Sequence, residues 1–105
     1  MKVLVVEPGK QPQIQDIEST LTAMQMTVGG YIESIYPWWD EVALICNDAG
    51  KIMGLPLNRL LFNDDGDLID YIVGTFFICG APMDSGGFGS LSDEQITRYS
   101  EMFKL

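Results

Sequence analysis

The amino-acid sequence predicts an α+β fold built on a mostly antiparallel sheet. Short β-branched and aromatic runs separated by turn residues indicate about five strands, most of them joined as hairpins. Two amphipathic stretches and one ambiguous segment indicate two or three helices. We expect the two main helices to pack on one face of the sheet. The length of 105 residues predicts a single domain spanning 1–105.

The predicted strands are runs of the residue types that favour a pleated sheet, each bounded by turn residues. They are Lys2–Glu7, Gln13–Ile17, Tyr31–Tyr36, Glu41–Cys46 and Thr75–Cys79. We expect the first two to form one hairpin and the next two another, with 75–79 in the centre of the sheet. Leu68–Val73 is also apolar, and Lys51–Gly54 is either a short strand or an extended connection.

Two segments carry helix signals. The first has one apolar face, made of Ile17, Leu21, Met24 and Val28. We expect Ser19 as its N-cap and Gly29 as its stop. The second helix should follow the capping box Ser92–Gln95. Leu55–Phe62 fits either a third helix beginning at Pro56 or an ordered loop.

The charge of the chain restricts its partners. Fifteen acidic and six basic residues give a net charge of -9. Such a charge disfavours nucleic-acid phosphates and anionic membranes, so we expect neither direct nucleic-acid binding nor membrane association. It is compatible with a basic protein partner or with mimicry of a nucleic acid, although the acidic residues are scattered and only 64–70 approaches a row of carboxylates.

Cysteine usage and hydropathy predict a cytoplasmic protein. Cys46 and Cys79 each lie in an apolar run, so we interpret both as reduced core residues, with a pair of thiols on neighbouring strands as the alternative. No apolar run has the length of a membrane span, and the N-terminal run is too short for a signal peptide.

The sequence lacks the residues of common catalytic and metal sites. There is no histidine, which removes the usual general base, the usual zinc ligand and every Ser-His or Cys-His nucleophile pair. Phosphate-binding glycine motifs are also absent. Around Gly66, a calcium-loop alignment would place Leu61 and Ile72 where carboxylates are needed. We therefore predict no enzyme, no cofactor and no metal.

Arg59 and Asn58 are the best candidates for a binding site, because they interrupt an apolar run. A guanidinium among leucines needs a partner. In the functional interpretation these two residues, with Asn47 and Tyr31, recognise the carboxylate or phosphate of a small anionic ligand. In the structural interpretation Arg59 instead caps backbone carbonyls or pairs with an acidic residue (Asp70 or Glu33).

Trp38 and Trp39 are candidates for contact with a partner protein. They lie at the predicted tip of the second hairpin, where an indole can stack on a ligand or a partner. The alternative is that one of the two rings folds back over the edge of the sheet.

Several segments in order resemble the bacterial and phage family known as domain of unknown function 3846 (DUF3846). They are Lys2–Gly9, Val28–Glu33, Val42–Asn47, Gly50–Lys51, Gly54–Arg59 and Gly74–Ile78. The resemblance covers nearly the whole chain. It implies no established activity, but it implies an accessory product of phages, plasmids or conjugative elements, with a role in defence, counter-defence or element maintenance.

These observations favour a small non-catalytic binding or regulatory module of mobile-element type. Its partner would be a protein or a small anionic ligand, and a homo-oligomer is compatible with the sequence. The alternative is a counter-defence protein that sequesters a nucleotide signal or acts as an acidic inhibitor of a nucleic-acid-binding enzyme. An enzyme with an acidic residue as its base is a weaker alternative, because it needs two carboxylates facing each other in a cleft.

Overall fold

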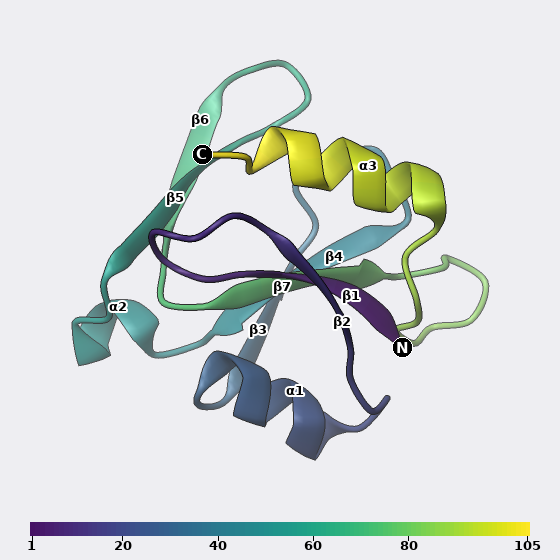
Figure 1. The fold of residues 1–105 in the computed structure, drawn as a ribbon, viewed down its shortest axis with the longest axis horizontal. Helices are drawn as coiled ribbons and strands as arrows, with labels where there is room; N and C mark the ends of the chain where they lie inside the picture. The colour runs from purple at the N-terminus through teal and green to yellow at the C-terminus, as the bar shows by residue number, and fades with distance from the viewer.

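A five-stranded antiparallel sheet forms the centre of the protein in a computed structural model that describes residues 1–105. The strands follow the order β2-β1-β7-β4-β3. Their bounds are Lys2–Val6 for β1, Gln13–Asp16 for β2, Ile32–Ile35 for β3, Val42–Asn47 for β4 and Phe76–Gly80 for β7. Both predicted hairpins are present, and β7 occupies the predicted central position (Figure 1). The α+β class is confirmed.

Two further strands form a separate antiparallel hairpin. They are β5, Leu57–Phe62, and β6, Leu68–Val73. The prediction of a helix or loop over 55–62 was therefore wrong. In β5 the side chains of Arg59 and Leu61 are buried while those of Leu60 and Phe62 are exposed, which is the alternation of a strand with one covered face. Leucines also recur there at helical spacing, so the sequence did not distinguish the two-residue period of a strand from the 3.6-residue period of a helix.

The structure contains three helices, and hydroxyl side chains cap the starts of α1 and α3. α1 spans Leu21–Val28, and Thr20 rather than Ser19 is its N-cap, since the Thr20 hydroxyl accepts a hydrogen bond from the Ala23 amide at 3.1 Å. Gly29 ends α1 in the left-handed conformation, as predicted. α2, Gly50–Met53, is one turn where a strand or connection was expected. α3, Asp93–Met102, starts at the predicted Ser92–Gln95 capping box.

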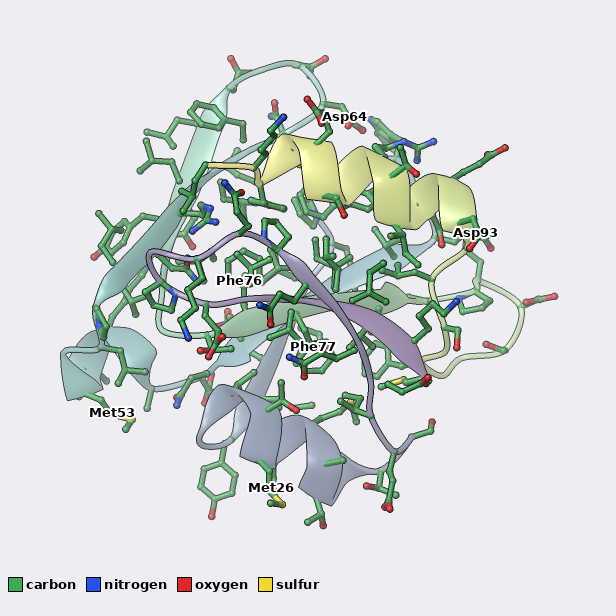
Figure 2. All side chains as sticks on the ribbon, viewed as in Figure 1. Met26, Met53, Asp64, Phe76, Phe77 and Asp93 are labelled. Atoms are coloured by element: carbon green, nitrogen blue, oxygen red, sulfur yellow. The ribbon has the colours of Figure 1, made fainter.

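The two main helices lie on opposite faces of the central sheet, not on one face as the sequence suggested (Figure 1). Along β7, Phe76 belongs to the apolar cluster under α3, and Phe77 to the cluster under α1 (Figure 2). Every residue of β4 and β7 is buried. A sheet whose central strands are apolar on both sides must be covered on both sides, and this is the physical reason for the correction.

Each face has its own core. α1 contributes Met24 and Val28 to the smaller cluster. On the other face α3 contributes Ile96 and Tyr99, and the β5–β6 hairpin contributes Leu61 and Ile72. The hairpin therefore completes the layer that α3 begins.

None of the helices is both long and apolar enough to cross a membrane.

Both cysteines are free and buried, as predicted. The two cysteines lie on the neighbouring strands β4 and β7, but Cys46 belongs to the core under α3 and Cys79 to the core under α1. The sheet therefore separates the two thiols, and they do not form the alternative pair. Burial raises the pKa of Cys46 to about 11 and that of Cys79 to about 12.

Replacing Gly80 with alanine tests the close approach at the end of β7. Gly80 exchanges two backbone hydrogen bonds of 2.8 Å with Gly89, and a Cβ atom there would lie 2.5 Å from the Ser90 carbonyl oxygen. Because backbone must move to relieve that clash, we expect Gly80→Ala to lower the free energy of unfolding by about 1–3 kcal/mol in urea denaturation. Gly87→Ala, where a Cβ meets nothing within 4 Å, is the matched control and should leave stability nearly unchanged.

Candidate functional site

The guanidinium of Arg59 is buried and bound within the chain. Only 9% of the residue is exposed. Nε donates to the Phe103 carbonyl at 3.0 Å, and Nη2 donates to the Lys10 carbonyl at 2.7 Å. Nη1 donates to the side-chain oxygen of Asn58 at 2.7 Å and to its carbonyl at 3.4 Å. Burial lowers the pKa of Arg59. The donors therefore join β5 to the β1–β2 loop and to the end of α3.

Asn58 extends this connection to the central sheet. Its side-chain amide donates to the Val6 carbonyl at 2.9 Å and to the Gly74 carbonyl at 2.8 Å, while its oxygen accepts from Arg59. The two residues act as one unit, which we call the Asn58–Arg59 clamp. The structural interpretation of Arg59 as a cap of backbone carbonyls matches this geometry. The alternative, an ion pair with Asp70 or Glu33, does not form, and Asp70 pairs with Lys51 instead.

The structure does not bring the four predicted ligand residues together. Asn47 is buried, and its amide group donates to the Val28 carbonyl at 3.3 Å and accepts from the Ala49 amide at 2.9 Å. It therefore joins the end of α1 to the turn before α2. Tyr31 is 78% exposed just before β3. Asn47 and Arg59 line different hollows of the surface.

The two predicted partner-contact residues have opposite environments. Trp38 is only 7% exposed, its indole nitrogen donates to the Phe62 carbonyl at 3.1 Å, and its ring lies 4.8 Å from that of Tyr99. Trp38 is thus a core residue, which corrects the prediction for it. Trp39 is 96% exposed, and only its backbone amide is held, by the Asp64 carboxylate at 2.6 Å.

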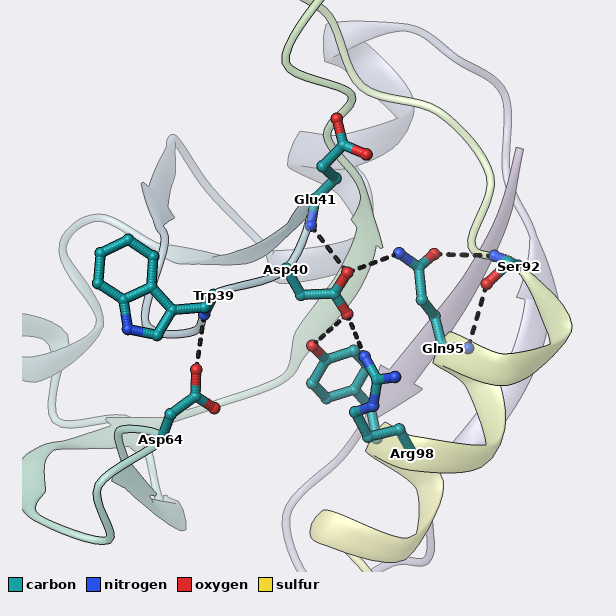
Figure 3. Close-up of polar contacts among 8 residues, drawn as sticks. Trp39, Asp40, Glu41, Asp64, Ser92, Gln95 and Arg98 are labelled. Atoms are coloured by element: carbon teal, nitrogen blue, oxygen red, sulfur yellow. Dashed lines mark hydrogen bonds and ion pairs between the residues drawn. The ribbon is translucent and has the colours of Figure 1, made fainter.

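Asp40, beside these tryptophans, fixes the same loop to α3. Its carboxylate accepts from Arg98 at 2.6 Å, Tyr99 at 2.7 Å and Gln95 at 3.1 Å, and from the Glu41 amide at 2.8 Å (Figure 3). Burial raises the pKa of Asp40, but these hydrogen bonds and the Arg98 charge outweigh it and hold the pKa below its usual value. With every lone pair engaged, Asp40 is a structural acceptor.

A cleft opens between the β3–β4 edge and β6. Its volume is about 280 Å³. We call it the β3–β6 cleft. It is lined by Glu33, Ile35, Cys46, Asn47, Asp48, Lys51, Ile52, Asp70, Tyr71, Ile72 and Val73. The buried lining residues are Cys46, Asn47 and Ile72, and the more exposed rim carries three carboxylates and one ammonium group. Among the predicted ligand residues, Asn47 alone lines this cleft.

The charges of the β3–β6 cleft are only partly balanced. Lys51 Nζ lies 2.7 Å from Asp70 Oδ1 and 4.2 Å from the centre of the Tyr71 ring. The hydrogen bond from Lys51 lowers the pKa of Asp70 and the same contact raises the pKa of Lys51. Glu33 and Asp48 have no salt bridge, so the rim keeps two uncompensated carboxylates. The acidic residues do not form a group that could hold a metal ion.

Sequence reasoning missed this cleft because its charged residues come from separate elements. Lys51 and Asp70 are 19 residues apart, on α2 and β6. The available signal was the single acidic residue within the apolar run Leu68–Val73, which indicated a side chain at the margin of the core rather than inside it.

Fold and site together define a small α+β domain, with an amphipathic cleft where a two-stranded sheet meets a five-stranded one. The chain belongs to the family of the domain of unknown function DUF3846, whose model matches residues 1–104. No curated protein and no solved structure matches the chain.

Replacing Arg59 with methionine tests the clamp. Methionine keeps an unbranched apolar side chain but leaves the Lys10, Asn58 and Phe103 acceptors without their donor. We expect the free energy of unfolding to fall by about 2–4 kcal/mol in urea denaturation. Arg59→Lys should recover only part of the loss, because one ammonium group cannot reproduce a planar fork.

The matched control is the second arginine of the chain. Arg98 contacts Asp40 at the surface, and Asp40 keeps its other donors when Arg98 is removed. Arg98→Met should therefore be much less destabilising than Arg59→Met. Equal effects of the two substitutions would contradict the assignment of Arg59 as a structural clamp.

Proposed function

We propose that this chain is a non-catalytic binding module with a regulatory role in the cytoplasm. Its β3–β6 cleft binds a small ligand that has both a positive charge and an apolar group. One observation carries the proposal: a partly apolar cleft of about 280 Å³ has a rim of three carboxylates and a single lysine. Ligand sites are concave, mostly apolar and completed by a few polar groups. A volume just below the usual range for drug-sized ligands favours a small molecule or a single side chain.

The charge of the rim supports a cation as the ligand. Asp70 neutralises Lys51, which leaves Glu33 and Asp48 facing a cationic group. The whole chain has a net charge of -9, which attracts cations and repels anions. The anionic ligand expected from the sequence depended on Arg59, whose donors are engaged within the fold, and we propose a cationic ligand in its place.

The titratable groups of the cleft support binding without catalysis. A general acid or base works best with a pKa near the working pH, yet Lys51 lowers the pKa of Asp70. A nucleophilic thiol needs a lowered pKa, whereas burial raises that of Cys46 to about 11. Cys46 is also buried in the floor of the cleft.

The reduced, buried cysteines and the acidic surface support a cytoplasmic location, where thiols stay reduced. A regulatory role in a phage or mobile element is part of the same proposal. The cleft supports the binding part of this role, while the setting in a mobile element rests on the resemblance to the DUF3846 family alone.

Titration with a matched pair of small molecules tests the ligand class. Phenethylamine and phenylacetate share an aromatic ring and differ in the sign of their charge. We expect phenethylamine to shift the amide NMR signals of Glu33, Asp48 and Asp70 in a saturable way, while phenylacetate leaves them unchanged. The double variant Glu33→Gln/Asp48→Asn should bind phenethylamine about tenfold more weakly, a loss of ~1.4 kcal/mol.

The control variant, Asp93→Asn/Glu94→Gln, removes the same two charges from the start of α3, away from the cleft. It should retain the affinity of the natural chain within about twofold, since screening weakens distant surface charges. If both double variants weaken binding equally, the cleft is not the site. If a cyclic nucleotide or ADP-ribose shifts the cleft signals and phenethylamine does not, the proposal is replaced by sequestration of a nucleotide signal.

A further inference from the structure

We propose a second site, which docks a basic, arginine-containing segment of a partner protein. It is the hollow between the loop after β3 and the β5–β6 turn, with a volume of about 440 Å³. We call it the Trp39 hollow. It is lined by Tyr36, Pro37, Trp38, Trp39, Asn63, Asp64 and Asp65. The observations that support it are independent of the β3–β6 cleft, since no residue lines both.

The backbone of Trp39 is held in place although its side chain is exposed. Trp39 is 96% exposed, and its indole points away from the Asp40 network (Figure 3). Its amide donates to Asp64 at 2.6 Å. On one side Trp38 is buried in the core, and on the other Asp40 accepts four hydrogen bonds. Because the backbone is already fixed, a partner has to order only the indole side chain on binding.

The aromatic content of the hollow is typical of a protein interface. Tyr36, 62% exposed, lines it together with Trp39. Tryptophan and tyrosine are enriched among the residues that supply most binding energy, because they bury a large area with few rotatable bonds. No internal packing requires Trp39 at this position, since almost none of its surface is covered.

The charge of the hollow specifies the chemistry of the partner. Asp64 and Asp65 are exposed in the turn beside the aromatic rings, and neither forms a salt bridge. No lysine or arginine lines the hollow. An arginine side chain satisfies both features, because its planar guanidinium stacks on an aromatic ring and binds a carboxylate with two parallel hydrogen bonds.

The same charge argues against other occupants. A second copy of this chain would bring another net charge of -9 against the hollow, and an anionic membrane would be repelled in the same way. A basic protein segment is complementary in both charge and aromatic surface. We therefore assign the hollow to such a segment.

Titration of the isotope-labelled chain with the acetylated peptide Gly-Arg-Arg-Gly tests this assignment. The Trp39 indole N–H signal and the Asp64 and Asp65 amides should shift in a saturable way. A peptide with glutamate in place of arginine should leave them unchanged, and one with lysine should bind more weakly than the arginine peptide because lysine lacks the planar fork. The signals of Glu33 and Asp70 report separately on the β3–β6 cleft.

Two variants and one control localise the binding. Trp39→Ala removes the exposed ring, and Asp64→Asn/Asp65→Asn removes two charges while keeping an oxygen that accepts the Trp39 amide. Each should weaken binding of the arginine peptide about fivefold or more. Asp93→Asn/Glu94→Gln, with the same change of net charge, should weaken it less than about twofold. Trp39→Ala should unfold at nearly the natural temperature, since its side chain is exposed.

Four outcomes would overturn the proposal. In the first, Trp39→Ala keeps the natural affinity. In the second, the arginine peptide shifts only the β3–β6 cleft signals, which would assign the cation to the cleft and leave the proposed function intact. The third is concentration-dependent self-association, measured by sedimentation, that shifts the Trp39 signal. The last is binding to vesicles containing phosphatidylserine with no binding to the peptide.

Discussion

The Asn58–Arg59 clamp is the interaction on which the arrangement of the two sheets depends. Arg59 and Asn58 donate to carbonyls of the β1–β2 loop, of β1, of the β6–β7 turn and of the end of α3. No other polar contact joins the β5–β6 hairpin to so many distant segments. A buried guanidinium is costly unless its donors are satisfied, so its position fixes that of the hairpin. The guanidinium also lies in a strongly acidic chain that supplies it with backbone and amide oxygens instead of a carboxylate.

Both candidate sites result from where the hairpin is held. The β3–β6 cleft exists because β6 stands beside the β3–β4 edge without pairing with it, and Lys51 and Asp70 meet across that gap. The Trp39 hollow forms where the β5–β6 turn reaches the loop after β3, which Asp64 and Trp39 connect. One structural constraint therefore supplies two acidic, partly aromatic surfaces. We propose positively charged partners for both, and the net charge of -9 supports that proposal.

Local signals in the sequence predicted local structure well. The two hairpins of the central sheet, the central β7 and the capping box of α3 were predicted, because turn residues and caps act over a few positions. The β5–β6 hairpin was not predicted. The opposite placement of the helices was missed, although the unbroken apolar runs of β4 and β7 are typical of strands covered on both faces. Arg59 was identified as needing acceptors, but these are backbone carbonyls of residues 44 and 49 positions away, which no side-chain pattern reveals. The pair of Lys51 and Asp70 in the β3–β6 cleft was missed for the same reason, because its two residues are 19 positions apart in the sequence.

Native-state hydrogen exchange on Arg59→Met tests the central role of the clamp most directly. If the clamp holds the hairpin against the sheet, amides of β5 and β6 should exchange about tenfold or more faster relative to amides of β7 than they do in the natural chain, through local opening of the hairpin. The large apolar core around β7 should keep its relative protection. Equal loss of protection in β5, β6 and β7, or unchanged protection of the hairpin, would contradict the account.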